Sequence, residues 1–336
     1  METALTFDDV TLVPHFSNVA SRNDTCLKTN LTKKTQIDLP IICANMDTTI
    51  GDEMAEELLS NGIFPIFHRF TMLEQQKNWV KKYKNKCFIS CGLGKLDETV
   101  QLLKLGAIGV CIDIAHGHTK NMISMIKAIK KHCPDKEVIA GNVCTPEAVQ
   151  DLIDAGADAV KCGIGPGSCC TTRMVTGFGV PQFTAVKECA QIAQKYGVPL
   201  IADGGIRGSS DIAKSLAAGA SCVMIGGLFA KTYESPVEKV EKNGKIFSQY
   251  RGQASEEFQK SYYGKMKKGT VAEGVSFEVE CTGPVQRLID ELCGGVRSSF
   301  TYGGAKNIKE FQNKTKFRPV TQNYIKESNF RQNIIF

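Results

Sequence analysis

The sequence predicts a (β/α)8 barrel, and three observations favour this fold class. Short apolar, β-branched runs alternate with segments whose apolar residues recur every three or four positions, as in helices that pack on a parallel sheet. Eight such runs are present, which is the number that closes a parallel barrel. A doubly wound open sheet is the alternative, but it is disfavoured because no GxGxxG motif follows the first run.

The expected strands follow one another along the chain. In order they are residues 40–46, 63–68, 87–91, 108–114, 138–143, 159–163, 200–203 and 222–225. The spacing lengthens between the sixth and seventh strands, and the additional chain, residues 163–180, is the first irregularity.

Two helices between these strands are indicated most clearly. Thr145 provides an N-cap, Pro146 a first-turn proline and Glu147 a first-turn acid, and Gly156 suits the C-terminal cap of the same helix. The preceding unit carries an apolar stripe at helical spacing, formed by Met122, Ile126, Ile129 and Cys133.

The second irregularity is residues 231–282, a stretch rich in Lys, Glu, Gly and Ser that we call the flap. It separates the eighth strand from a helix expected around residues 285–292. A long polar segment on the catalytic face of a barrel is expected to be a mobile lid. The whole chain, residues 1–336, is therefore expected to form one barrel domain with the flap inserted between strand eight and the last barrel helix.

Composition excludes several classes of protein. With 42% hydrophobic and 23% charged residues, the chain is expected to fold as an ordinary globular protein. The first residues carry acidic charge without Lys or Arg, and no apolar run reaches membrane-spanning length, so we expect a cytoplasmic protein with no membrane anchor. The 14 cysteines are scattered and lack zinc-ligand spacing, which indicates reduced thiols. A net charge of +6 is modest, so nucleic-acid binding is not indicated, whereas a phosphorylated small molecule is compatible.

The loop after the sixth strand, residues 163–173, combines glycines, hydroxyls and two adjacent thiols. Barrels place their chemistry on such loops, and a cysteine there is a nucleophile if its thiolate is favoured. Thr172 follows Cys170 by two residues and is expected on the same side. The residues themselves leave Cys169 and Cys170 open as the nucleophile. Most of the other cysteines are expected to be small buried side chains, for example Cys43, Cys111, Cys162 and Cys222.

The loops after strands seven and eight are candidates for phosphate binding. Asp203 precedes Gly204 and Gly205, and strand eight ends in Gly226 and Gly227. An acid followed by glycines suits ribose hydroxyls and phosphate; the alternative for Asp203 is a cap on the next helix. Asp113, at the end of strand four, could likewise accept ribose hydroxyls, and its alternative is a salt bridge at the barrel rim.

Six segments together resemble the IMP dehydrogenase/GMP reductase family over nearly the whole chain. The resemblance implies a barrel fold, a homotetramer, a 5′-phosphorylated purine ligand and a nicotinamide cofactor. The matching segments are residues 6–10, 44–48, 140–143, 163–173, 203–205 and 294–305.

Within that family, the motif at residues 165–173 looks like the reductase branch and implies roles for individual residues. The nucleophile falls on Cys170 and the proton-transfer residues fall on Thr172 and Glu273, while Cys169 occupies a variable position. The residues implied for potassium are Gly165, Gly167, Cys170 and Arg173. Those implied for GMP are Ser168, Asp203, Gly204, Gly205, Gly226, Gly227, Gly252, Gln253, Ala254, Ala272 and Gly274. Those implied for NADPH are Ser21, Arg22, Arg69, Asp113, Ala115, Ser298, Ser299, Phe300 and Thr301.

This chain departs from the family pattern at two of those positions. Gln253 stands where Met or Ser is usual, and Arg69 stands where one reductase branch has Lys. Both departures bear on affinity more than on the type of reaction.

The resemblance implies NADPH-dependent reductive deamination of GMP to IMP and ammonia through a covalent purine–cysteine adduct. Dehydrogenases of the family activate water with an Arg–Tyr pair, but residues 253–273 contain no arginine; their tyrosines are Tyr262 and Tyr263, accompanied only by Lys260, Lys265, Lys267 and Lys268. No regulatory insertion follows His68. The alternatives are an IMP dehydrogenase without a regulatory domain, a non-catalytic nucleotide-binding regulator and a flavin-dependent barrel.

Overall fold

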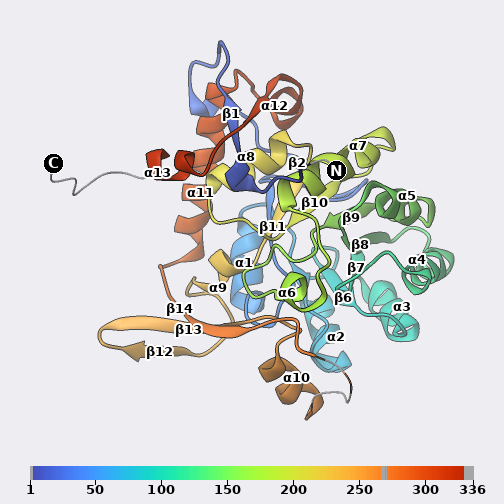
Figure 1. Ribbon diagram of the computed structural model, residues 1–336. Coiled ribbons are helices and arrows are strands. Elements are labelled where there is room, and N and C mark those ends of the chain that lie inside the picture. Colours follow the sequence, from blue (N-terminus) through green and yellow to red (C-terminus); the bar gives the residue numbers. More distant parts are fainter. Residues whose placement is uncertain (1–2, 266–268, 270, 329–336) are drawn as a thin grey trace.

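A computed structural model describes residues 3–265, 269 and 271–328, and its centre is a (β/α)8 barrel (Figure 1). The strands form one 8-stranded sheet in the order β4-β11-β10-β9-β8-β7-β6-β5, and the pairs in it are parallel. Since β4 and β5 are the two ends of this ladder, the barrel is nearly closed. The predicted fold class is confirmed, and the open doubly wound alternative is wrong.

All the predicted barrel strands are present, with small differences at their ends. They are β4 (Ile41–Cys43), β5 (Ile66–Phe67), β6 (Phe88–Cys91), β7 (Gly109–Asp113), β8 (Glu137–Val143), β9 (Ala159–Cys162), β10 (Leu200–Asp203) and β11 (Cys222–Ile225). Every residue of β6, β9 and β11 is buried, because helices cover the outside of the sheet and side chains fill its inside. Burial on both faces is what makes these strands continuous apolar runs in the sequence.

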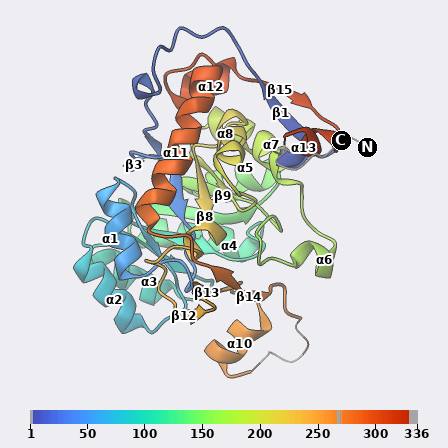
Figure 2. The same ribbon diagram turned by 90° about the vertical axis from the view of Figure 1, so that its left-hand side faces the viewer.

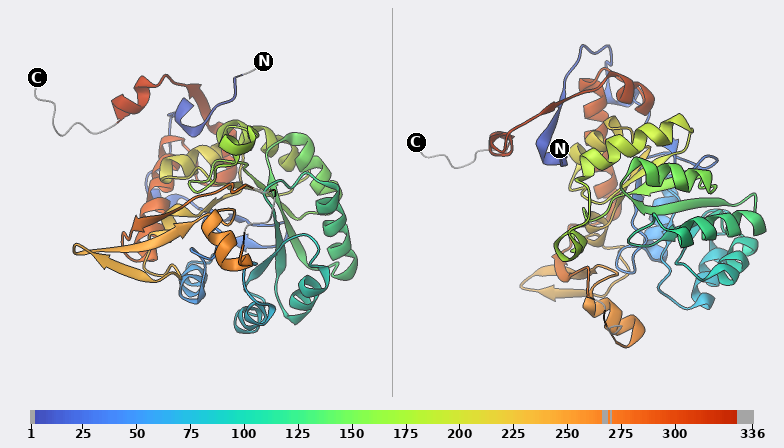
Figure 3. Two further views of the ribbon diagram at one scale, coloured as in Figure 1. Left: turned by 60° about the horizontal axis from the view of Figure 1, so that its bottom comes forward. Right: turned by 45° about the vertical axis from the view of Figure 1, so that its right-hand side comes forward.

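The helices that follow the strands cover the outside of the sheet, and those drawn from cyan to green succeed one another around it (Figure 3). They are α1 (Asp52–Ser60), α2 (Leu73–Lys82), α3 (Leu96–Leu105), α4 (Lys120–His132), α5 (Pro146–Asp154), α7 (Gln182–Lys195), α8 (Ser209–Ala217) and α11 (Val285–Tyr302). The signals predicted for α5 are confirmed: the Thr145 side chain accepts the N–H of Ala148, and Gly156, just past the helix, has φ +108°.

The flap has more regular structure than its polar sequence indicates. It contains a 3-stranded antiparallel sheet of β12 (Lys239–Lys242), β13 (Lys245–Arg251) and β14 (Ser276–Glu280), with α10 (Glu256–Tyr263) between the last two strands. Figure 2 shows this sheet and α10 at one end of the molecule. Lys267 and Lys268 lie outside the described residues.

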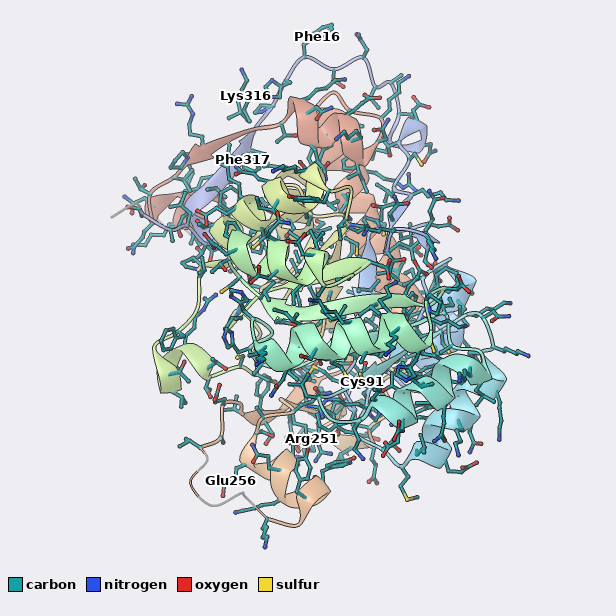
Figure 4. The ribbon with its side chains drawn as sticks, turned by 90° about the vertical axis from the view of Figure 1, so that its right-hand side faces the viewer. Phe16, Cys91, Arg251, Glu256, Lys316 and Phe317 are labelled. Carbon is teal, nitrogen blue, oxygen red and sulfur yellow. The ribbon has the colours of Figure 1, made fainter. Side chains whose placement is uncertain are left out.

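The two ends of the chain meet on the side opposite the flap. Strand β1 (Val10–Val13) pairs with β15 (Lys316–Pro319), and α12 (Ile308–Lys314) lies nearby, whereas Arg251 and Glu256 of the flap lie at the far end from Phe16 and Lys316 (Figure 4). The remaining short elements are η1 (Phe7–Asp9), η2 (Arg22–Asp24), β2 (Thr29–Asn30), β3 (Gln36–Ile37), α6 (Thr172–Thr176), α9 (Gly227–Ala230) and α13 (Asn323–Ser328).

The buried core joins the barrel strands to the inner faces of the helices. The cysteines predicted to be small buried side chains, Cys43, Cys111, Cys162 and Cys222, all belong to it, and burial raises the pKa of Cys43 and Cys222 to about 12. All 14 cysteines are free thiols. Among the described helices, none is both long and apolar enough to cross a membrane.

Candidate active site

A cavity of about 530 Å³ opens at the carboxyl ends of the barrel strands, under the flap. Its walls come from the loop after β9 (163–170), the ends of β10 and β11, and two flap segments (250–254 and 273–274). The cavity therefore unites the predicted nucleophile loop with the predicted phosphate loops, as the barrel fold requires.

Three of the predicted catalytic side chains form a continuous hydrogen-bonded chain. The thiol of Cys170 lies 3.2 Å from Oγ1 of Thr172, and this hydroxyl donates to Oε2 of Glu273 at 2.8 Å. A thiol, a hydroxyl and a carboxylate in this order can relay a proton between the carboxylate and a group bound at the sulfur.

Backbone hydrogen bonds hold Glu273 in place even though it lies far along the chain. The N–H of Thr171 donates to the Glu273 carbonyl at 2.9 Å, and the N–H of Val275 donates to the Cys169 carbonyl at 2.9 Å. On the other side, the Glu273 N–H donates to the carbonyl of Ala254 at 3.1 Å. The return segment of the flap is thus joined to the cysteine loop by an isolated antiparallel β-bridge between Cys170 and Gly274.

The two adjacent cysteines, either of which could be the nucleophile on sequence grounds, have different environments in the structure. The side chain of Cys169 is only 4% exposed and packs with Tyr250, Ala230 and Val279. Burial raises the pKa of Cys169 to about 12, although a hydrogen bond with Tyr250 opposes the shift. Both cysteines line the cavity, but Cys170 is half-buried and contacts Thr172. Cys169 is therefore the packed thiol of the two, and Cys170 is the more accessible one.

The predicted phosphate cradle consists of backbone that neighbouring atoms approach so closely that only glycine fits there. A Cβ placed on Gly226 would lie 2.5 Å from the Tyr250 hydroxyl, and one on Gly204 would lie 2.9 Å from Pro166. Gly204 and Gly205 also have φ values of +89° and +79°, which L-residues with side chains rarely adopt. Close approach of these loops brings their backbone to the cavity wall, where N–H groups without a protein acceptor can bind an anion; the N–H of Gly204 donates to the Met224 carbonyl at 3.4 Å. Tyr250 was not predicted; its place on a flap strand gave no signal in the sequence.

Of the residues predicted to bind the nucleotide, all line the cavity except Ala272. Those that line it are Ser168, Asp203, Gly204, Gly205, Gly226, Gly227, Gly252, Gln253, Ala254 and Gly274. The amide of Gln253 donates to the Asn45 carbonyl at 2.9 Å, so this departure from the family pattern joins the flap to the loop after β4.

A buried lysine that sequence reasoning missed lines the floor of the cavity. Lys161 on β9 is 2% exposed, and its ammonium contacts Asp113 at 2.9 Å and Asp203 at 2.7 Å. The salt bridge weighed for Asp113 is therefore present, and Asp203 contacts Lys161 and Asn142, which makes the helix-cap alternative wrong. The available signal was a single charge, Lys161, within an otherwise apolar strand.

The contacts between Lys161 and the two aspartates shift the pKa values of Asp113 and Lys161. Burial alone would raise the pKa of Asp113, but the charge and hydrogen bond of Lys161 outweigh it and hold that pKa below its usual range. Burial alone would lower the pKa of Lys161, but the two carboxylates outweigh it and raise that pKa instead. Asp113 and Lys161 are therefore both charged at neutral pH.

The residues predicted to hold the nicotinamide cofactor fall into two groups. Arg69, Asp113 and Ala115 line the cavity. Nε of Arg69 is buried and has no hydrogen-bond partner within the described part of the chain, and the guanidinium lies 4.1 Å from the centroid of the Phe70 ring. A half-buried guanidinium that lines the cavity and whose Nε lacks a protein acceptor fits the anionic and aromatic parts of a dinucleotide.

The second group lies on η2 and on the C-terminal half of α11, and these residues do not line the cavity: Ser21, Arg22, Ser298, Ser299, Phe300 and Thr301. The two elements contact one another through the Arg297 guanidinium and the Thr25 carbonyl. Phe300 is 0% exposed and stacks on Phe311, so its side chain belongs to the core and only its backbone can face a ligand.

The residues predicted to bind potassium lie on one loop. The carbonyl of Gly167 accepts the Cys170 N–H at 3.0 Å, and that of Arg173 accepts the Gly177 N–H at 3.1 Å. Each carbonyl retains a second lone pair that a cation could use. Within the described residues, no cluster of His, Cys, Asp or Glu has the arrangement of a metal site. Carbonyl oxygens are thus the ligands that this loop can offer, and potassium stays a prediction.

The IMP dehydrogenase/GMP reductase domain matches residues 4–331. A GMP reductase of Clostridium acetobutylicum is 43% identical over 92% of this chain and 93% of its own length. An inosine-5′-monophosphate dehydrogenase of Cryptosporidium parvum is 36% identical over 96% of this chain and 94% of its own. The structure of a GMP reductase from Trypanosoma brucei, solved with guanosine 5′-monophosphate, superposes with a TM-score of 0.91 at 27% identity, over 99% of this chain and 98% of that one.

Proposed function

Because the chain belongs to the IMP dehydrogenase/GMP reductase family, we propose that it catalyses the NADPH-dependent reductive deamination of GMP to IMP and ammonia. Such an enzyme serves the salvage and interconversion of purine nucleotides. The observation that carries the proposal is the hydrogen-bonded chain from Cys170 through Thr172 to Glu273. It joins a nucleophile to a carboxyl group, which is what removal of a purine amino group requires.

The proposed reaction steps follow from the positions of Cys170, Thr172 and Glu273. The Cys170 sulfur adds to C2 of the purine, and Thr172 and Glu273 deliver a proton to the exocyclic nitrogen, since an unprotonated amine is a poor leaving group. The C2–N bond then breaks and ammonia departs. When bound, NADPH supplies the hydride that converts C2 to the C–H of IMP as the thiolate leaves.

Ligand binding is assigned to the residues that surround these groups. We propose that Ser168 and the four cradle glycines hold the phosphate, and that Asp203 accepts the ribose hydroxyls. Arg69, Asp113 and Ala115 would hold the near part of NADPH. Potassium would bind carbonyls of the loop at residues 165–173 and fix the position of Cys170.

IMP dehydrogenase is the second candidate, because relatives of that name match almost the whole chain. The position of Glu273 favours the reductase. Its carboxylate reaches Thr172 from the flap at 2.8 Å, where it can protonate a leaving nitrogen. The stretch from residue 253 to 273 contributes no arginine for water activation.

The direct test is to mix purified protein with GMP and NADPH and follow the nicotinamide absorbance together with released ammonia. One ammonia per NADPH oxidised supports the proposal. Binding of GMP without oxidation of NADPH would support a non-catalytic regulator instead, and a bound yellow chromophore would support a flavin enzyme.

We also propose that the chain is a single catalytic domain without a regulatory insertion and acts as a cytoplasmic homotetramer. Only residues 68–72 join β5 to α2, where a regulatory domain would be inserted. Light scattering of the purified protein tests the tetramer.

A further inference from the structure

Lys161 is the one charged side chain on β9, and it forms part of the floor of the cavity. Its ammonium has three N–H donors and three acceptors: Oδ1 of Asp113 at 2.9 Å, Oδ2 of Asp203 at 2.7 Å, and Oδ1 of Asn142. A fully satisfied ammonium in a buried site is fixed in one position. Lys161 therefore sets the spacing between the two carboxyl groups.

The two carboxyl groups face different parts of the cavity, and each is held from a second side. Asp113 ends β7, and its Oδ2 accepts from the Asn45 amide at 3.1 Å. Asp203 ends β10, and its Oδ2 also accepts from Asn142 at 2.9 Å. Among the described residues no donor reaches Oδ1 of Asp203, so this oxygen is available to a hydroxyl of a ligand.

We propose that Lys161 is a positioning residue shared by both nucleotide subsites, holding Asp203 for the ribose of the purine nucleotide and Asp113 for the cofactor. The proposal rests on the function proposed above, in which those two aspartates contact the two ligands. Although Lys161 lines the cavity, all three donors of its ammonium are engaged by protein acceptors, so it acts through the aspartates. It neutralises one of two neighbouring buried carboxylates, and without it their mutual repulsion and desolvation would favour protonation or displacement of one of them.

The test compares single and charge-balanced variants by the KM for GMP, the KM for NADPH and kcat. Lys161→Met keeps the length of the side chain and removes its charge. We expect both KM values to rise by about tenfold or more, since the two neighbouring carboxylates are no longer neutralised and repel one another out of position. Asp113→Asn should raise the KM for NADPH alone. Lys127→Met, on the exposed side of α4, is the control and should change neither.

The double variant Lys161→Met/Asp113→Asn decides between positioning and general structural support. It keeps the net charge that Lys161, Asp113 and Asp203 have together, so the KM for GMP should return close to the wild-type value while that for NADPH stays high. Lys161→Arg, which keeps the cation, should recover much of both. If Lys161→Met proves unfolded by circular dichroism, the double variant and Lys161→Arg carry the test.

A rise in only one KM for Lys161→Met, or no recovery of the KM for GMP in the double variant, would overturn the proposal. Failure of the proposed function looks different, because the wild-type protein would then not oxidise NADPH with GMP. In that case the dissociation constants of GMP and NADP⁺, measured by calorimetry on the same variants, test Lys161 in the same way.

Discussion

Arg251 of the flap donates through Nε and Nη2 to Oδ2 of Asp47, at 3.0 and 2.6 Å. Asp47 lies on the loop after β4, so this largely buried ion pair fastens the base of the flap to the barrel. Burial raises the pKa of Asp47, whereas the hydrogen bond and charge of Arg251 lower it. The flap strand β13 is thus anchored close to the segment that carries Glu273.

Loss of this anchor should slow turnover more than it weakens nucleotide binding. Arg251→Gln is expected to lower kcat by about tenfold, the factor that corresponds to roughly 1.4 kcal/mol, because Glu273 would spend less time at Thr172. Steady-state kinetics and limited proteolysis of the flap measure the effect. Arg287→Gln, at the exposed Arg287–Glu291 pair on α11, is the matched control. An unchanged kcat in Arg251→Gln would refute this role of the anchor.

The two adjacent cysteines should behave very differently. Cys170→Ala should abolish turnover and leave GMP binding largely intact, because apart from Ser168 the phosphate and ribose contacts lie on other loops. Cys169→Ala should be mild. With a pKa of about 12, Cys169 has roughly one thiolate in ten thousand molecules at pH 8, so iodoacetamide should not label it there. Kinetics, calorimetry and peptide mapping test these outcomes, and the reverse pattern would show that Cys169 is the nucleophile.

Glu273 and Thr172 should matter more for ammonia release than for hydride transfer, since only the former needs a proton on the leaving group. Glu273→Gln keeps the size of the side chain and removes the acid, so deamination should stall. Hydride transfer run from IMP and NADP⁺ bypasses deamination and should be affected less. Equal losses in both assays would contradict this division of roles.

The protein should not oxidise IMP to XMP. Hydrolysis of the purine–cysteine adduct needs an activated water, and residues 253–273 have no arginine to pair with Tyr262 or Tyr263. Purified protein is incubated with IMP and NAD⁺, and XMP is sought by chromatography. Multiple turnovers of XMP would replace the reductase assignment with a dehydrogenase.

Activity should depend on a small monovalent cation. Replacing K⁺ with tetramethylammonium at constant ionic strength should lower kcat, because the carbonyls near Cys170 would lose the charge that fixes their loop. Restoring K⁺ should restore kcat. Equal activity in both salts would remove potassium from the proposed site.

The barrel was predictable because its strands are buried on both faces, and such strands are continuous apolar runs in the sequence. The bounds of β10 and β11 agree with the prediction to the residue. The flap sheet was missed because its strands are mostly exposed and polar, so neither an apolar run nor strict alternation marks them.

The catalytic loop residues could be predicted because barrels place chemistry after their strands, and the family resemblance named them. Lys161 and Tyr250 could not, because their roles depend on partners brought close only by folding. The residues alone left Cys169 and Cys170 open and only the family resemblance pointed to Cys170, because which of two adjacent thiols is covered depends on the fold. Likewise, sequence alone could not show that Ser21 and Ser298 lie away from the cavity of their own chain.

The distance along the chain between Thr172 and Glu273, 101 residues, has a consequence for how the protein acquires its activity during folding. Contacts between distant segments form late, because closing a long loop costs entropy before the contact repays it. The phosphate cradle joins Ser168 to glycines that lie closer to it along the chain than Glu273 does to Thr172, and the Glu273 contact also requires the flap to fold back. A refolding chain should therefore regain affinity for GMP before it regains catalysis, and the interval between the two measures how long the flap takes to dock.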